Sequence, residues 1–262
     1  NAGVVRVHNT NKAVAASVDS SATYCYAHPL TGGKQIVCES WRNMISVGAK
    51  PIAITNCLNF GNPENKEVMG EFAECLVGIK EACEFLNFPV VSGNVSFYNG
   101  TNKKNIYPTP VIGGVGLIKK LSQPLNHFFK GHNNKLILIG KTFGHLEQSC
   151  FLKENYSINI GMPPEINLLN EKNNGESLLK LIEKNLVLSS HDISNGGLIT
   201  ALSEMAINSD YGAKIQKPKK LTNLFRYFFG EDQARYIIEI EAHNLSKVEK
   251  ILKDDDIYYE NI

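Results

Sequence analysis

The chain of 262 residues is 43% hydrophobic and carries 27 basic against 26 acidic residues, a net charge of +1. This composition predicts one large or two small folded domains and argues against a nucleic-acid partner, which usually needs a basic face. No apolar run approaches the roughly 18 residues of a membrane helix, and the first residues do not resemble a secretion signal, so neither a membrane nor export is expected.

The six cysteines lie mostly inside apolar runs and show no C-x-x-C spacing. We therefore expect buried free thiols in a reducing compartment, and a cytoplasmic location. The chain has no initial methionine and stops within a strand-like run, so we expect it to be a piece of a longer protein.

The first half alternates strand and helix patterns. Strands are predicted at residues 4–8, 13–19, 51–58, 89–92 and 110–118, and a first helix at 35–47. A second helix shows an apolar stripe at steps of three and four, formed by Val68, Phe72, Leu76, Ile79, Cys83 and Leu86. This alternation predicts an α/β domain over residues 1–122.

The pattern lapses into polar residues and aromatics after residue 119, and we place a linker at 123–134. A second α/β domain, incomplete at its end, is predicted over 135–262. Its strands are expected at 135–139, 186–190, 211–215 and 234–240, and its helices at 175–184, 193–208 and 245–253.

Two polar turns form the candidate site. Thr55–Glu64 and Ser92–Ser96 each accompany a short apolar run, so each should lie at the C-terminal end of a buried strand, where α/β sheets bind ligands. Their amide oxygens, hydroxyls and glycines suit a phosphate or a metal-bound nucleotide. An Asx-turn followed by a helix start at Pro63–Glu64 also explains the end of the first run, and the two interpretations coexist because a capped helix N-terminus is a good anion site. An ordinary strand-to-turn transition is the alternative for the second run.

Three other motifs have ordinary explanations. Gly113–Gly116 lacks the G-x-G-x-x-G spacing of dinucleotide sites and predicts tight packing of a strand against a helix. His191 and Asp192 could be a base and the group that orients it, or Asp192 could be a metal ligand, but an N-cap of the following helix at Asp192 or Ser194 is the favoured interpretation. Lys217–Lys220 is interpreted as a solvated loop.

Several runs, taken together, resemble one family. The similarity is dense through about residue 118 and thinner beyond it. It is carried by Val47–Ala53, Leu58–Glu64, Pro89–Ser96, Ile106–Gly113, Gly140–Leu146 and His191–Leu198. This combination resembles the second half of the large subunit of phosphoribosylformylglycinamidine synthases of the small bacterial type, within the aminoimidazole-ribonucleotide-synthetase-like superfamily.

The resemblance implies a ligase that forms C–N bonds in purine synthesis. ATP would activate the amide oxygen of formylglycinamide ribonucleotide, and glutamine-derived ammonia would displace phosphate, with ATP and Mg²⁺ as cofactors. The implied fold is an N-terminal α/β domain that pairs with its equivalent in the first half, followed by a C-terminal α/β sandwich domain. The implied partners are that first half, a glutaminase subunit and a small accessory subunit, with an active site that spans both halves. Pairing through the N-terminal domain is expected to be pseudo-dimeric or homodimeric.

By position in the family motifs, Asn56 and Gly93 would contact ATP, Asn94 would hold magnesium, and Ser96 would contact the ribonucleotide. Asn56 replaces an aspartate of the family, which removes a negative charge but keeps a nucleotide contact possible. Asp192 resembles a metal ligand of the equivalent first-half motif and would serve an auxiliary nucleotide site. No catalytic residue is assigned here, because the family's catalytic histidines lie in the first half.

Two alternatives stay open. The chain could be a non-catalytic scaffold half that carries a structural nucleotide. It could also be a stand-alone relative such as selenophosphate synthetase, thiamine-phosphate kinase or a hydrogenase-maturation protein, although Leu58–Glu64 does not resemble those proteins. If the first interpretation holds, we expect the isolated chain to have no synthase activity.

Overall fold

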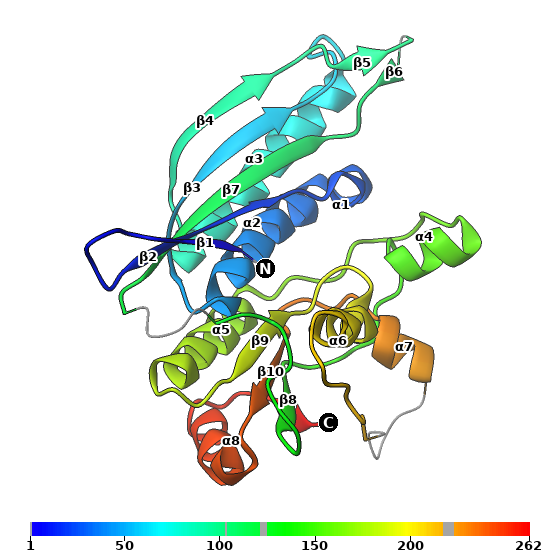
Figure 1. Ribbon diagram of the computed structural model, residues 1–262. Coiled ribbons are helices and arrows are strands. Elements are labelled where there is room, and N and C mark those ends of the chain that lie inside the picture. Colours follow the sequence, from blue (N-terminus) through cyan, green and yellow to red (C-terminus); the bar gives the residue numbers. More distant parts are fainter. Residues whose placement is uncertain (1, 103, 121–124, 217–222) are drawn as a thin grey trace.

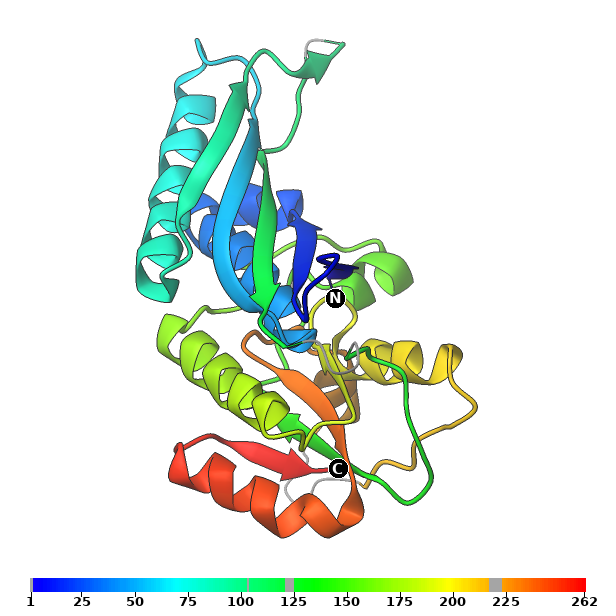
Figure 2. The ribbon, with the colours of Figure 1, turned by 60° about the vertical axis from the view of Figure 1, so that its left-hand side comes forward.

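The computed structural model describes residues 2–102, 104–120, 125–216 and 223–262, which form two α/β units stacked one on the other (Figures 1 and 2). The first unit is built on a five-stranded sheet in the order β1 (Gly3–Arg6), β2 (Ala13–Asp19), β7 (Thr109–Ile118), β3 (Lys50–Asn59) and β4 (Val90–Ser96). Only β3 and β4 pair in parallel. A small hairpin of β5 (Gly100–Thr101) and β6 (Lys104–Asn105) extends beyond the sheet.

The helices α2 (Pro29–Ser46) and α3 (Lys66–Leu86) cover one face of this sheet, and the short α1 (Ala22–Ala27) precedes α2 (Figure 2). The predicted stripe of α3 is confirmed, since all six of its residues belong to the core or pack against it. The glycines of β7 allow α2 to approach closely: a Cβ at Gly114 would collide with the Ser40 hydroxyl, and one at Gly116 would lie 3.1 Å from Met44 Sδ. The prediction of tight strand–helix packing at these glycines is therefore confirmed.

No helix of the described residues covers the other face of the first sheet (Figures 1 and 2). Apolar residues still point outward from it, because side chains alternate between the two faces of a strand. Val5 and Val18 are 71% and 77% exposed. We call this surface, formed by the outward-facing residues of β1, β2 and β7, the open face.

The second unit has an antiparallel sheet in the order β11 (Tyr259–Asn261), β8 (Lys135–Ile139), β10 (Tyr236–Ile240) and β9 (Ser189–Asp192). The helices α5 (Leu168–Glu183) and α8 (Leu245–Asp254), which follows the 3₁₀ turn Ala242–Asn244, pack with one face. The helices α6 (Gly197–Ile207) and α7 (Leu224–Phe229) pack with the other, and α4 (Cys150–Tyr156) lies beside α7. Successive residues of β10, such as Ile237 and Ile238, therefore enter two different cores.

The two units share one of these cores, which runs from α2 and β7 into β8, β10 and α8. A buried ion pair crosses the same junction: Arg42 Nη1 lies 2.5 Å from Glu171 Oε1, and both side chains are almost completely buried. Arg42 Nη2 also donates to Gln233 Oε1 at 2.7 Å. Burial alone would lower the pKa of Arg42, but Glu171 and Glu39 keep it raised, so the guanidinium is always charged.

Several predicted boundaries are wrong. Residues 211–215 alternate like a strand but do not pair with one, and α5 begins at Leu168 instead of residue 175. The helices α1, α4 and α7 were not predicted. The lysine run 217–220, the last two residues of the predicted first domain (121–122) and the first two of the predicted linker (123–124) lie outside the described residues.

All six cysteines are free, and four of them are buried, as predicted. Among the described residues, no helix has both the length and the apolar character that crossing a membrane requires.

Candidate functional site

The run Ser92–Ser96 and the first half of the run Thr55–Glu64 lie within strands, which corrects the prediction that they form turns; residues 60–64 form the loop that follows β3. β3 continues to Asn59 and β4 to Ser96, and the two pair in parallel with Asn56 opposite Gly93 and Cys57 opposite Asn94. β4 is the edge strand of the sheet and most of it is exposed, so its polar side chains remain in contact with water. Backbone pairing there does not require apolar side chains.

Asn56 points toward α3, where it lines a cavity of about 430 Å³ together with Leu76, Ile79, Cys83 and Val90, among others. Its amide oxygen lies directly over Gly93, and a Cβ at residue 93 would overlap it. Gly93 is thus needed to make room for the Asn56 side chain. The Asn56 amide makes no hydrogen bond with the other described residues, so both its donor and its acceptor are available.

Asn94 and Ser96 point to the opposite face of the sheet, because they follow Gly93 with the two-residue period of a strand. Ser96 Oγ donates to Asn99 Oδ1 at 3.2 Å, and Asn99 Nδ2 donates to the carbonyl of Phe60 at 3.0 Å. Asn94 is exposed and makes no hydrogen bond with other described residues. The sheet therefore separates the side chain of Asn56 from those of Asn94 and Ser96, and all of them lie at the β3–β4 edge.

The loop that follows β3 contains the predicted Asx-turn, in which Asn62 Oδ1 accepts the N–H of Glu64 at 2.9 Å. The helix does not begin at Pro63–Glu64, however. α3 begins at Lys66, and Asn65 caps it by accepting the N–H of Glu67 at 2.9 Å.

Asp192 ends β9 at the junction between the units and is 2% exposed. The prediction that Asp192 or Ser194 caps the next helix is wrong. The N-cap of α6 is Gly196, at a φ of 78°, with no side-chain cap. Burial would raise the pKa of Asp192, but the hydrogen bond and charge of His191 outweigh it and hold this pKa well below its ordinary value. His191 Nε2 lies 2.8 Å from Glu204 Oε2.

Further polar residues gather near Asp192 from the first unit. Asn43 is 5% exposed, and its Nδ2 donates to Asp19 Oδ1 at 2.7 Å. Burial raises the pKa of Asp19, and the charge of Asp192 adds to that shift. The pKa of Glu39 is raised to about 7 by burial and by the charges of Asp19 and Asp192, although Arg42 opposes the shift. The carboxyl groups of Asp19, Glu39 and Asp192 lie close enough to repel one another.

Sequence analysis missed this junction cluster, which we define as Asp19, Glu39, Asn43 and Asp192. Glu39 and Asn43 are four residues apart in one helix, so the sequence could have shown that they share a helix face. Asp19 stands out as a charged residue at the end of an apolar strand. Their meeting with Asp192 depends on how the units dock. Among the described residues, no group of three or more His, Cys, Asp or Glu side chains has the arrangement of a metal site.

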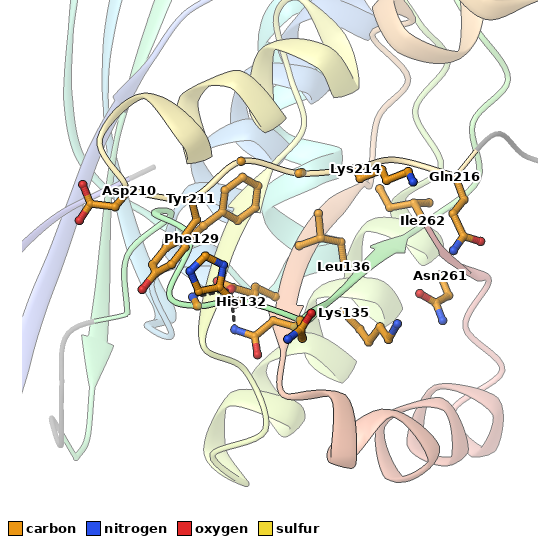
Figure 3. Close-up of a pocket in the computed structure, with 16 residues that line it drawn as sticks. Phe129, His132, Lys135, Leu136, Asp210, Tyr211, Lys214, Gln216, Asn261 and Ile262 are labelled. Atoms are coloured by element: carbon orange, nitrogen blue, oxygen red, sulfur yellow. Dashed lines mark hydrogen bonds between the residues drawn. The ribbon is translucent and has the colours of Figure 1, made fainter.

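A separate cavity of about 310 Å³ lies at the edge of the second sheet (Figure 3). Its lining includes Lys135, Tyr211, Lys214 and Asn261, and Asp210 points away from the other labelled residues. It contains none of the predicted site residues.

Comparisons with known proteins cover both units. The model of the AIR synthase related protein N-terminal domain matches residues 1–118, and that of the C-terminal domain matches residues 132–262. Phosphoribosylformylglycinamidine synthase subunit PurL of Pelagibacter ubique is 62% identical over 261 residues, 100% of this chain and 36% of that protein. The same subunit of Bradyrhizobium diazoefficiens is 48% identical over 248 residues, 94% of this chain and 34% of that protein. The chain thus spans about a third of the length of these relatives.

Solved structures of Thermotoga maritima PurL are also similar. The complex with FGAR has a TM-score of 0.79 at 17% identity, covering 100% of this chain and 43% of that one. The complex with ATP has a TM-score of 0.77 at 18% identity, covering 100% and 41%. PurLQS has a TM-score of 0.69 at 19% identity, covering 100% and 42%. At these identities the similarity shows a shared fold.

Proposed function

This chain belongs to the AIR synthase related protein family, and we propose that it is the second half of the synthetase subunit of a phosphoribosylformylglycinamidine synthase. The reaction is the ATP-dependent amidation of formylglycinamide ribonucleotide to the amidine. The observation that carries this proposal is the 62% identity with the P. ubique PurL subunit along the whole chain.

We assign ATP contacts to Asn56 and Gly93 and a ribonucleotide contact to Ser96. Their position supports this assignment, since all three lie on paired strands at an exposed sheet edge. A nucleotide that lies along β4 can reach both faces of the sheet there. Activation of an amide by phosphoryl transfer depends mainly on positioning and on neutralising phosphate charge, which backbone N–H groups and amides can support.

Asn94 is the residue we assign to magnesium. Its exposed amide oxygen has no hydrogen-bond partner among the described residues, and an amide oxygen is a ligand that this hard cation accepts. A single protein oxygen is a sufficient protein ligand for magnesium, because this ion keeps several water ligands and also binds phosphate oxygens. When bound, magnesium neutralises phosphate charge during transfer.

The exposed apolar side chains of the open face support the proposal of a pairing partner. We propose that the equivalent domain of the first half covers it, since exposed apolar patches commonly mark interfaces. The catalytic residues then come from that first half, a glutaminase subunit supplies ammonia, a small accessory subunit joins the complex, and the isolated chain is inactive. The reaction would take place in the cytoplasm.

The test is Asn94→Ala in the full-length subunit. We expect turnover to fall by about 100-fold with unchanged folding, because one oxygen ligand at a phosphoryl-transfer site is lost. Asn170→Ala in α5, another exposed asparagine, is the matched control and should retain activity. Unchanged turnover and magnesium dependence in Asn94→Ala would contradict the proposal and favour the scaffold alternative.

A further inference from the structure

The end of β4 is held by a tight turn whose last residue is not among the proposed ligand contacts. Residues 97–99 follow Ser96 and lead into β5 at the outer end of the first sheet (Figure 1). Tyr98 has a φ of 59°, in the left-handed region that residues other than glycine rarely adopt. The chain reverses there, and the Asn99 side chain returns to contact Ser96.

Asn99 contacts Ser96 through both ends of its amide. Ser96 Oγ lies 3.2 Å from Asn99 Oδ1 and 3.1 Å from Asn99 Nδ2. Asn99 Nδ2 also donates to the backbone carbonyl oxygens of Phe60 and Ser96, both at 3.0 Å. Because a carbonyl oxygen can only accept, these two carbonyls determine which end of the amide is the NH₂ group. Asn99 Oδ1 is then left to accept the Ser96 hydroxyl.

The backbone supports the same contact. The N–H of Asn99 donates to the carbonyl of Phe60 at 3.2 Å, and the N–H of Phe60 donates to the carbonyl of Ser96 at 3.0 Å. Phe60 is 1% exposed, and its ring packs edge-on against Phe72 of α3 at 5.0 Å between ring centroids. The turn is thus anchored through Phe60 to the core beneath the sheet, and Asn99 is held against Ser96.

The ordering of Ser96 matters because β4 is the exposed edge strand of the sheet. Asn94, two residues earlier on the same face, makes no hydrogen bond with other described residues, so its side chain is free to rotate. The Ser96 hydroxyl is instead fixed by Asn99 without any ligand. A contact group that is ordered in advance loses less conformational entropy when the ligand binds.

We propose that Asn99 is a positioning residue for the ribonucleotide, which holds the Ser96 hydroxyl in the orientation that contacts this substrate. The inference rests on the proposed synthase function and on the ribonucleotide contact assigned to Ser96. Among the residues that the structure describes, the Asn99 side chain bonds to Ser96 and Phe60 and to none of the residues assigned to ATP or magnesium. Its effect should therefore be specific for the ribonucleotide.

The test compares Asn99→Ala, Ser96→Ala and the double variant in the full-length subunit. The matched control is Asn105→Ala in β6. Asn105 Oδ1 accepts the N–H of Asn62 at 3.0 Å, so it supports the same loop after β3 without contacting Ser96. We measure kcat, the KM values for formylglycinamide ribonucleotide and for ATP, and the unfolding temperature.

We expect Asn99→Ala to raise the KM for the ribonucleotide about tenfold, with kcat within about threefold and the KM for ATP within about twofold. Ser96→Ala should raise the KM for the ribonucleotide by a similar factor. In the Ser96→Ala background, Asn99→Ala should add less than about twofold, because the hydroxyl that Asn99 positions is already absent. Asn105→Ala should leave both KM values within about twofold of wild type.

An unchanged KM for the ribonucleotide in Asn99→Ala would overturn the inference. An equal effect of Asn99→Ala with and without the Ser96 hydroxyl would also overturn it, since a merely structural role would act in both backgrounds. If Asn99→Ala does not fold, Asn99→Asp decides by the same criteria, because a carboxylate keeps the size of the side chain but cannot donate to the two carbonyls.

Other outcomes bear on the proposed function instead. An unchanged KM in Ser96→Ala would refute the ribonucleotide contact of Ser96, and the role of Asn99 would be refuted with it. Absence of synthase activity in the wild-type subunit would refute the proposed function itself. An active enzyme in which only Asn99→Ala has no effect would refute the positioning role alone.

Discussion

The two sheets of this chain are buried in different ways. In the second unit, helices pack on both faces of the sheet, and Ile237 and Ile238 are both 0% exposed on opposite sides of β10. In the first unit, helices cover one face only, and Val18 remains 77% exposed on the other. The second sheet is covered on both faces by helices of this chain, whereas the first has an apolar surface that a further sheet could cover. Burial therefore distinguishes the face that we propose a partner covers.

The largest expected contrast comes from placing a charge on each sheet. Ile238→Asp in β10 should destabilise the chain by about 4 kcal/mol or more, because it buries an unpaired carboxylate. Val18→Asp on the open face should change stability by less than about 0.5 kcal/mol. Urea unfolding measures both values. Co-purification of Val18→Asp with the first half should be impaired, and undisturbed co-purification would argue against the open face as the interface.

The next largest effect concerns the junction that joins the sheets. Arg42→Met should cost about 3–5 kcal/mol, because it leaves Glu171 buried without its cation. Adding Glu171→Leu should recover much of this loss, since the uncompensated charge is then removed. Thermal and urea unfolding of the single and double variants measure the coupling. Equal stability of the two variants would mean that the ion pair is not coupled.

A smaller effect is expected at the β3–β4 edge. Gly93→Ala should cost about 2 kcal/mol, because the added methyl group meets the Asn56 side chain. Asn56→Ala combined with Gly93→Ala should cost less than the sum of the single changes. Urea unfolding of the four members of this cycle tests the contact. Strict additivity would show that the two side chains do not compete for space.

The smallest expected effect is a pH dependence at the junction. The folded-state pKa of Glu39 is raised to about 7, above its ordinary value of 4.5, so the folded state binds the proton more tightly than the unfolded state. The protonated Glu39 side chain therefore contributes to the free energy of unfolding. This contribution is complete below about pH 4.5 and is lost as pH rises toward 7, at less than about 1.4 kcal/mol per pH unit. Glu39→Gln should flatten this part of the stability profile measured by urea unfolding. An unchanged profile would contradict the assignment.

The elements that sequence predicted well have strong periodicity and a local cause. The stripe of α3 reflects contact with one core face, and the glycines in the apolar run of β7 predicted its close packing against a helix. The end of β3 was less predictable, because asparagines there follow turn preferences while backbone pairing with β4 extends the strand. The strand predicted at residues 211–215 is absent, because alternating apolar residues form a strand only where a neighbouring strand can pair with them.

The candidate site was predictable only in part. The run around Asn56 and the run around Asn94 could be read as one site because both accompany apolar strands, but the opposite orientation of their side chains depends on register. The junction cluster depends on the approach of Asp192 to residues far away in sequence, such as Asp19 and Glu39, in units whose docking the sequence does not specify.

The core shared by the two units has a consequence for how the chain can be divided. Because α2, β8 and β10 contribute to one continuous apolar cluster, neither unit buries its own inner surface when alone. A protease cut between β7 and β8 should therefore yield two pieces that stay associated and melt in one calorimetric transition. The boundary between domain families along the chain is thus not a boundary between folding units.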